Sequence, residues 1–486
     1  MLPVTSQFAL SRPRIYHPIL LLLVIETVIL LASVLFSPIY TCVALFGICW
    51  IIICFLWPNI GTLVIALTIS SPFFLYLDRV RSTELTVALI GAAFLLSLLG
   101  GQDAHPHAST KIEAAASLFV AYMVLNCVWS IWRGNNLDYA FNELIPVAEM
   151  YVAYRLAVRT RFSHKSVRQF VCLIFVFVAA RGAWQIFLFL IGKAGTVVPP
   201  VFGDNADWAN INISGFEFTR LFDPIQGLYL APAFSFVLVL LSGRLRRVSA
   251  LMLLVGSLVL ALGLERGEWI ASIICVFVVI CLVRKRAADV FRRVTIGLAA
   301  IAAVGALMSM FLRNLPMSLG TILLDRLVGY TEQQVLDPRN SLQAVRFLEY
   351  VTTKNALASS ALFGHGLGSG LGTVVSDGIS LQFIPIHNYF LNLLANAGLV
   401  GAGLLLYLTV RLAKTLFERL KHARYTFDLG LVLSSIVAVL WYAVFSAFHP
   451  VYSSYHLPAL LGIYVGITIS YTGRAGYGIS IPARQG

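Results

Sequence analysis

The stretch HNYFLNLLANAGLVGAG, from His387 to Gly403, begins with two polar residues and continues as an apolar segment that contains many small residues. Apolar segments of roughly 17 to 25 residues are long enough to cross a bilayer as a helix. Small residues four positions apart let such a helix approach its neighbours closely. The pairs with this spacing are Ala397/Gly401 and Gly398/Ala402. The stretch therefore predicts a closely packed membrane helix with His387 and Asn388 at its water boundary.

The whole chain has the composition of a membrane protein. Of its 486 residues, 59% are hydrophobic and 12% are charged, whereas soluble domains carry roughly 25% charged residues. Runs long enough to span a bilayer lie at 18–36, 39–56, 59–77, 84–100, 113–132, 139–155, 168–192, 224–242, 248–263, 268–283, 294–312, 386–410, 427–448 and 457–472. We expect an all-α polytopic membrane protein with about 14 transmembrane helices, in a range of about 12 to 14. The first helix is expected to be retained rather than cleaved as a signal peptide.

The net charge of +13 follows the predicted topology. Basic residues concentrate in alternate loops, in the clusters 155–168, 244–247, 284–293 and 411–424. Because basic loops remain in the cytoplasm, these clusters predict that both termini are cytoplasmic. The charge therefore gives no reason to expect a nucleic-acid partner.

The sequence argues against several kinds of bound group. All seven cysteines lie within predicted spans, and no CxxC or Cys/His spacing is present. Neither a disulfide framework nor a zinc site is therefore predicted. The chain also has no Walker loop and no dinucleotide fingerprint. We expect no cofactor and no metal.

The longest segment between predicted spans is the outer loop 313–385. Long loops are usually functional or disordered, and apolar residues recur at helical spacing over 341–363, which predicts an amphipathic helix near the outer membrane surface. The sequence FGHGLGSGLG, residues 363–372, follows, and its glycines permit tight turns and close backbone approach to a ligand. We divide the chain into a transmembrane bundle (1–312), this loop domain (313–385) and C-terminal transmembrane helices (386–486).

His387 and Asn388 are candidates for chemistry because they end this loop at the mouth of a span. A neutral imidazole can accept a proton from a hydroxyl, and an asparagine amide can orient a partner or donate to an oxygen. The alternative is that both residues are interfacial polar residues that cap the helix. The sequence alone leaves both interpretations open.

The charged residues of the outer loops and spans also have two interpretations. Arg266 lies in a short outer turn at the level of the lipid headgroups, and Arg346 has Glu349 three positions on, which is the spacing of a surface ion pair. Arg220 precedes a span and can simply anchor it. Within the spans, charge is costly, so Arg181 is expected to pair with a carboxylate of the preceding span or to line a substrate path. The candidate carboxylates are Glu143 and Glu149.

Four stretches, taken in order, carry a likeness to a known family. They are RLFDP (220–224), LERGEW (264–269), NSLQAVRFLEY (340–350), and LFGHGLGSG (362–370) followed by HNYFLNLLANAGLVGAGLLLYL (387–408). Together they resemble the O-antigen ligase and O-antigen polymerase superfamily, which are polytopic glycosyltransferases of the bacterial inner membrane. Glu265 replaces the serine that is usual before the Arg-Gly turn. The resemblance covers residues 220–407, and it extends to the amino-terminal spans only by hydropathy.

The resemblance implies a GT-C-like fold that acts on an undecaprenyl-pyrophosphate-linked glycan at the periplasmic face. Carried over by motif, Arg266 and Arg346 would hold the pyrophosphate, and His387 would be the general base on the acceptor hydroxyl. Arg220, His365 and Asn388 would contribute to substrate binding. Guanidinium groups suit the charge of a departing pyrophosphate, and no outer loop contains a DxD metal motif. The resemblance therefore implies a metal-independent, inverting enzyme.

The acceptor distinguishes two activities within this superfamily. A ligase joins the glycan to lipid A-core, whereas a polymerase joins one repeat unit to another on the same carrier. The His-Asn stretch favours the ligase, and O-antigen or exopolysaccharide polymerase is the alternative. A transporter or flippase of lipid-linked sugars is the alternative of another class. Transporters generally show repeats and broken helices at the bilayer midplane, whereas the polar candidates here lie at the outer face.

Overall fold

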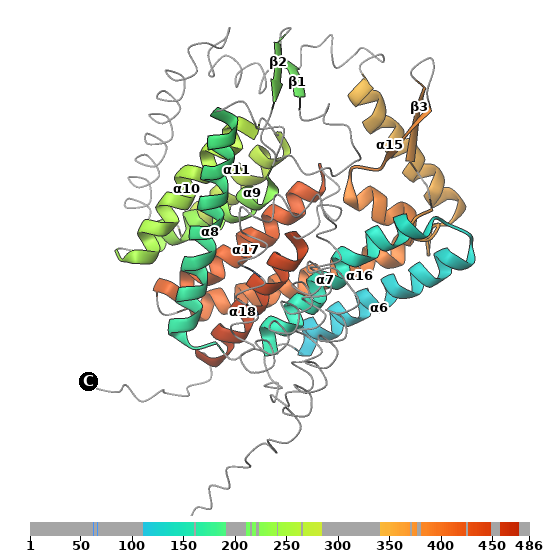
Figure 1. Cartoon of the computed structure of the whole chain (residues 1–486). Coiled ribbons are helices and arrows are strands. Elements are labelled where there is room, and N and C mark those ends of the chain that lie inside the picture. Colours follow the sequence, from blue (N-terminus) through green and yellow to red (C-terminus); the bar gives the residue numbers. More distant parts are fainter. Residues whose placement is uncertain are drawn as a thin grey trace, which may run out of the picture.

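The computed structural model of the chain describes residues 62, 66, 110–159, 162–190, 210–213, 216–219, 223–240, 242–263, 266–283, 341–369, 372–376, 381–423, 426–448 and 457–475. These residues are mainly helical (Figure 1). The helices are α6 (Thr110–Trp132), α7 (Leu137–Arg159), α8 (His164–Leu190), α9 (Pro224–Val239), α10 (Arg244–Gly263), α11 (Arg266–Leu282), α15 (Ser341–Ser359), α16 (Tyr389–His422), α17 (Thr426–Ser446) and α18 (Leu457–Ala475). The strands form two hairpins, β1 (Asn210–Ile213) with β2 (Phe216–Thr219) and β3 (Gly372–Ser376) with β4 (Leu381–Pro385).

The predicted spans correspond to helices wherever the chain is described. The spans from 113–132 to 268–283 coincide with α6 to α11, and the last three coincide with α16, α17 and α18. Within the described residues, five helices are long and apolar enough to cross a membrane: α6 from Lys111, α8, α10, α16 and α17. The spans predicted at 18–36, 39–56, 59–77, 84–100 and 294–312 lie outside the described residues, apart from Thr62 and Ala66. The helical membrane fold is confirmed, and the total of fourteen spans stays a prediction.

The two hairpins were not predicted. Both are antiparallel, and β3 pairs with β4 from Gly372 opposite Pro385 to Ser376 opposite Leu381. Their sequences, GTVVS and LQFIP, are rich in the β-branched and aromatic residues that favour strands. The second hairpin lies between α15 and α16 in the chain, so it leads from the helix α15 to the start of α16.

Helix α9 lies at the centre of the described bundle. Asp223 caps it by accepting a hydrogen bond from the Ile225 amide at 3.2 Å, and Pro224 occupies its first turn, where no backbone donor is needed. Almost every side chain of α9 is buried. A Cβ at Gly227 would overlap the ring of Trp441, so this glycine allows α17 to pack directly on α9. This central position explains why α9 is apolar on all sides.

Arg181 pairs with a different carboxylate from the two that the sequence suggested. Its guanidinium makes a bidentate contact with Asp223, through Nε at 2.7 Å and Nη2 at 3.2 Å, and both side chains are buried. The expected partners Glu143 and Glu149 on α7 were therefore wrong. Sequence spacing along the preceding span could not reveal Asp223, because the contact joins α8 to the cap of α9. The pair fixes the RLFDP segment at Asp223.

Candidate functional site

The end of the loop predicted at 313–385 and the start of α16 form one packed unit, which we call the junction. It consists of α15, residues 360–369 (the glycine turn), the β3–β4 hairpin and residues 386–398. Figure 1 shows α15 and β3 beside the first half of α16, and α6 and α7 below them. Helix α15 contacts both β3 and α16. The helix predicted at 341–363 is confirmed as α15, which ends at Ser359. Its amphipathic character and its place near the outer membrane surface stay predictions.

His387 is held by a buried carboxylate of α15. Its Nδ1 lies 2.7 Å from Oε1 of Glu349, and its backbone amide donates to the same oxygen at 3.1 Å. The Glu349 side chain is 1% exposed, whereas that of His387 is 28% exposed. The carboxylate is therefore enclosed by protein, and the imidazole faces partly outward.

This geometry selects one tautomer of the imidazole. An ionised carboxylate only accepts hydrogen bonds, so Nδ1 is the donor and the neutral ring keeps its lone pair on Nε2. A carboxylate on the far nitrogen fixes the orientation of an imidazole and stabilises the imidazolium that forms when the ring takes a proton. The pair thus has the arrangement that a general base requires.

The backbone before His387 is anchored by apolar contacts. Ile386 is 2% exposed and packs in a small cluster with Ala356 of α15 and Ala395 of α16, against which Leu391 also packs. This cluster fixes the distance between α15 and α16 at the level of the Glu349–His387 pair. His387 is therefore positioned by packing as well as by hydrogen bonds.

Helix α16 is interrupted at Gly398, and the glycine turn pairs with the interruption. Gly398 has φ 66° and ψ −167°, a conformation that is essentially restricted to glycine. Around it, the His365 amide donates to the Ala395 carbonyl at 3.0 Å, and the Leu399 amide donates to the Ala361 carbonyl at 2.9 Å. A Cβ at Gly364 or at Gly398 would overlap backbone atoms of the other segment. The two glycines allow the two backbones to touch.

The small residues of α16 thus have two different functions. Gly401 packs as predicted, since a Cβ there would lie 3.1 Å from the ring of Tyr122 on α6. Gly398 was predicted to be part of a helix-packing pair with Ala402, and this was wrong because its backbone leaves the helix. The Tyr122 hydroxyl donates to the Ala397 carbonyl at 2.6 Å, next to the interruption.

A second carboxylate, the half-buried Glu143 of α7, connects three segments. Its Oε1 accepts hydrogen bonds from the side-chain amides of Asn392 at 2.9 Å and Asn396 at 2.8 Å. Its Oε2 accepts from the backbone amide of Gly368 at 3.3 Å. Ser369 adds a hydrogen bond to Asn396 at 2.6 Å. Glu143 therefore holds the glycine turn and the first turns of α16 on α7.

Side chains of the second half of α6 and of the α6–α7 turn continue this attachment. Asn126 accepts from the Leu367 amide at 3.0 Å and donates to the Phe363 carbonyl at 3.1 Å. Asn135 donates to the His365 carbonyl at 3.1 Å, and Ser130 donates to the Leu367 carbonyl. The backbone of the glycine turn is thus satisfied by protein partners, as buried backbone groups generally are. The turn is a rigid support for the start of α16.

Asn388 and His365 have structural contacts in this unit. Asn388 is the N-cap of α16, because its Oδ1 accepts from the amides of Phe390 at 3.0 Å and Leu391 at 3.1 Å. The capping alternative is confirmed for this residue. The His365 ring lies 2.9 Å from the Ser359 hydroxyl, so it ties the glycine turn to the end of α15. A contribution of either residue to substrate binding stays a prediction.

The three predicted arginines belong to different segments. Arg346 lies in α15, one turn before Glu349, and Arg266 is the first residue of α11. The side chains of both residues and the whole of Arg220 lie outside the described residues. The structure thus joins His387, Asn388, His365 and the helix of Arg346 in one unit. The convergence of the guanidinium groups on that unit stays a prediction.

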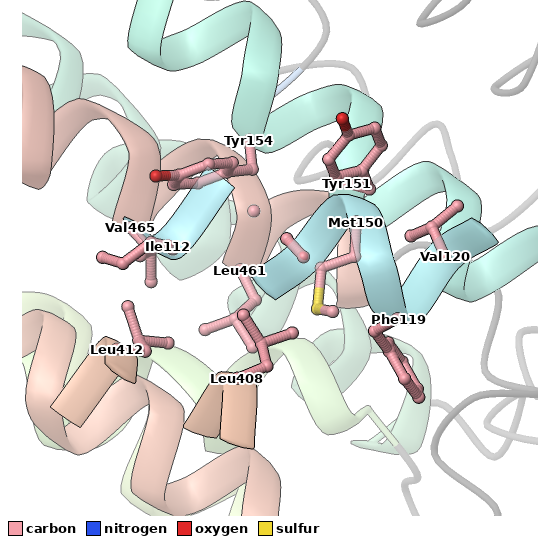
Figure 2. Close-up of a pocket in the computed structure, with 12 residues that line it drawn as sticks. Ile112, Phe119, Val120, Met150, Tyr151, Tyr154, Leu408, Leu412, Leu461 and Val465 are labelled. Atoms are coloured by element: carbon pink, nitrogen blue, oxygen red, sulfur yellow. The ribbon is translucent and has the colours of Figure 1, made fainter. Parts of the chain in front are cut away.

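A cavity between α6, α7, α16 and α18 is a weaker candidate. Figure 2 shows that its walls are almost entirely apolar, with Phe119, Met150, Leu408 and Leu461 among them. Its volume is about 70 Å³, below the roughly 300 to 1,000 Å³ of ligand pockets. It lies against the second half of α16, beyond Gly398, and its lining contains no carboxylate and no histidine.

Fold and junction together define a helical membrane protein with a carboxylate-oriented histidine at the start of a span. Residues 250–408 match the family model described as O-antigen ligase. This match supports a likeness of that segment to the O-antigen ligase and polymerase superfamily, and it includes the positions of Arg266, Arg346, His365 and His387. No curated protein matches the chain. An O-antigen-ligase-like function in a membrane is thereby supported.

The contacts of two carboxylates in this region were not predicted from the sequence. Glu349 was considered only as a surface partner of Arg346, yet its position on α15 places it beside His387. Glu143 was considered only as a partner of Arg181, although Asn392 and Asn396 bind it. The available signal was the i, i+4 spacing of these two asparagines, which puts both amides on one face of α16.

Proposed function

We propose that the protein is a glycosyltransferase of the O-antigen ligase type. It would transfer a glycan from undecaprenyl pyrophosphate to a hydroxyl of lipid A-core, at the periplasmic face of the bacterial inner membrane. The family match over 250–408 supports the class. The observation that carries the mechanism is the contact of the His387 imidazole with the buried Glu349 carboxylate.

In the proposed reaction, His387 is the general base and Glu349 is a positioning residue. Nε2 takes the proton of the acceptor hydroxyl while the hydroxyl oxygen bonds to the anomeric carbon of the donor. The bond from that carbon to the pyrophosphate oxygen breaks, and its electron pair leaves with undecaprenyl pyrophosphate. Attack opposite the leaving group inverts the anomeric centre. Glu349 stabilises the imidazolium until the proton is released.

The leaving group requires positive charge, which we assign to arginines. Arg346 lies in the helix that also carries Glu349, so the pyrophosphate and the base would be positioned by one element. Arg266 at the start of α11 would be the second phosphate ligand, and Arg220 would bind substrate near it. Guanidinium groups bind phosphate oxygens in bidentate fashion and need no metal. Asn388 and His365 would line the acceptor side.

The test uses a strain in which this gene is deleted. Wild-type protein and the variants His387→Gln, Arg346→Ala and Arg266→Ala are expressed at matched levels, and His422→Gln is the control. His422 is an exposed histidine at the far end of α16. Lipopolysaccharide and lipid-linked glycans are then separated side by side.

The proposal expects the three site variants to lose long-chain glycan on lipid A and to accumulate polymerised donor, whereas the control restores it. Accumulation of single repeat units would identify a polymerase with the same donor. Donor confined to the cytoplasmic leaflet would identify a transporter. Transfer at wild-type level by the three variants would contradict the assignment.

A further inference from the structure

The opposite end of the bundle contains an open cavity that the reaction does not use. Its volume is about 710 Å³, and it lies where the first turn of α8 meets the first turn of α10. This is the end that the positive-inside rule assigns to the cytoplasm. The residues that matter here are Phe162, Lys165, Arg168, Phe170, Arg244 and Leu245.

Positive charge from two helices converges on this cavity. Lys165 and Arg168 come from α8 and Arg244 comes from α10. The guanidinium of Arg168 reaches the α10 end of the cavity, since a Cβ at Gly243 would lie 3.3 Å from its Nη2. Three cationic side chains therefore surround one concave surface.

These cations also oppose the helix dipoles. The amino-terminal end of a helix carries partial positive charge and favours acidic side chains or bound anions. Neither α8 nor α10 has an acidic residue in its first turn, and both have basic residues there. An anion in the cavity would be stabilised by both helix ends and by the three side chains. By contrast, Arg155, another basic residue of this membrane face, pairs with Glu113.

The floor of the cavity is apolar. Phe162, Phe170 and Leu245 are buried, whereas Lys165, Arg168 and Arg244 are exposed. A ligand with a charged head and a hydrocarbon body matches this division. Basic pockets between helices at the cytoplasmic surface are suited to anionic lipid headgroups. The positive-inside rule explains why basic residues gather at this end of the bundle. It does not explain why three of them surround a cavity.

We propose that this cavity binds the phosphate of an anionic phospholipid from the cytoplasmic leaflet. Lys165, Arg168 and Arg244 would hold the phosphate oxygens, and the buried aromatic and leucine side chains would contact the glycerol and the first part of the acyl chains. The site does not depend on the proposed glycan transfer.

Among the described residues, the histidine and acidic neighbours of the cavity do not pair with its three cations. His164, which also lines the cavity, has its Nδ1 on the Tyr471 hydroxyl and its ring edge against Phe427. Asp428 lies near His164 and Tyr471 and is 4% exposed, so its carboxylate sits behind the cavity wall. His164 and Asp428 therefore form part of the wall and do not neutralise Lys165, Arg168 or Arg244.

The test measures which lipids remain bound to the full-length protein. Wild-type protein is reconstituted in nanodiscs of phosphatidylcholine with a minor fraction of phosphatidylglycerol, and retained lipids are counted by native mass spectrometry. The test variant is Arg168→Gln with Arg244→Gln. The control, Arg247→Gln with Lys414→Gln, removes the same charge from exposed residues that do not line the cavity. Equal midpoints of thermal unfolding verify that all three proteins are folded.

We expect wild type and control to retain phosphatidylglycerol in preference to phosphatidylcholine, and the test variant to lose about tenfold or more of that preference. A preference that falls equally in test and control variants would overturn the proposal, because only general surface charge would then matter. A separate arm adds inorganic phosphate to phosphatidylcholine nanodiscs. Stabilisation of wild type by phosphate, without any preference for phosphatidylglycerol, would identify a site for soluble phosphate and would also overturn the lipid assignment.

Discussion

Charged side chains are bound by other protein groups at one end of the bundle and exposed at the other. At the junction, the buried carboxylate of Glu349 is bound by the side chain and backbone amide of His387. The half-buried carboxylate of Glu143, which attaches the junction to α7, is bound by the amides of Asn392 and Gly368. At the opposite end, which we call the basic end, Lys165, Arg168 and Arg244 are exposed around an open cavity. Hydrogen bonds from the protein hold a buried charged group in one orientation, and a general base needs such a fixed orientation. Exposed charge leaves binding capacity for a molecule from outside.

The largest effect is expected at the histidine of the junction. Glutamine in place of His387 keeps a polar side chain of similar size but cannot take a proton at neutral pH. We expect the rate of glycan transfer by the reconstituted enzyme to fall by about 10²- to 10⁴-fold, the usual contribution of a general base. Binding of the lipid-linked donor should change little, which a separate binding measurement checks. An equal loss in His422→Gln would show that the effect is not specific to the junction.

The next effect is expected at the carboxylate behind the histidine. Glu349→Gln retains the shape of the side chain and removes its charge. We expect kcat to fall by about 10²-fold, with KM nearly unchanged, because the residue acts on the imidazolium and not on the substrate. A purely structural role would instead lower the unfolding midpoint and leave the kcat of the folded fraction at the wild-type value.

A smaller effect is expected where the glycine turn meets the interruption of α16. Gly398→Ala adds a Cβ that overlaps the backbone of Leu362 and Gly364. The alanine would also have to adopt a positive φ, which only glycine adopts easily. We expect a loss of about 1 to 3 kcal/mol in the free energy of unfolding. Gly403→Ala is the matched control on the same helix, because its Cβ would meet nothing within 4 Å. Thermal unfolding should show a lower midpoint for the first variant, and an unchanged midpoint would contradict the close backbone approach.

The smallest effect is expected at the basic end. The variant Arg168→Gln with Arg244→Gln, tested in phosphatidylcholine nanodiscs, should transfer glycan at a rate within about twofold of wild type, as distant surface substitutions usually do. The rate is measured with the same donor and acceptor as for the junction variants. A loss comparable to that of Glu349→Gln would mean that the two ends are not separate in function.

Much of the fold was predictable because apolar length and basic clusters are local properties of the sequence. Helix α15 and the polar start of α16 were predicted for the same reason. The Arg181–Asp223 and Glu349–His387 contacts were not, because each joins segments whose separation along the chain carries no periodic signal. The β3–β4 hairpin had a signal, since Asp377-Gly378 between β-branched runs favours a tight turn. The interruption at Gly398 had none, because glycine in a membrane helix equally predicts close packing.

The central claim is that Glu349 acts on catalysis through His387, and a double-mutant cycle tests it most directly. Transfer rates are measured for wild type, Glu349→Gln, His387→Gln and the double variant under one set of conditions. Residues that act as a unit give non-additive losses, so the double variant should be no slower than His387→Gln alone. A double variant slower by the product of the two single losses would show that the carboxylate acts independently of the imidazole, and it would contradict the account.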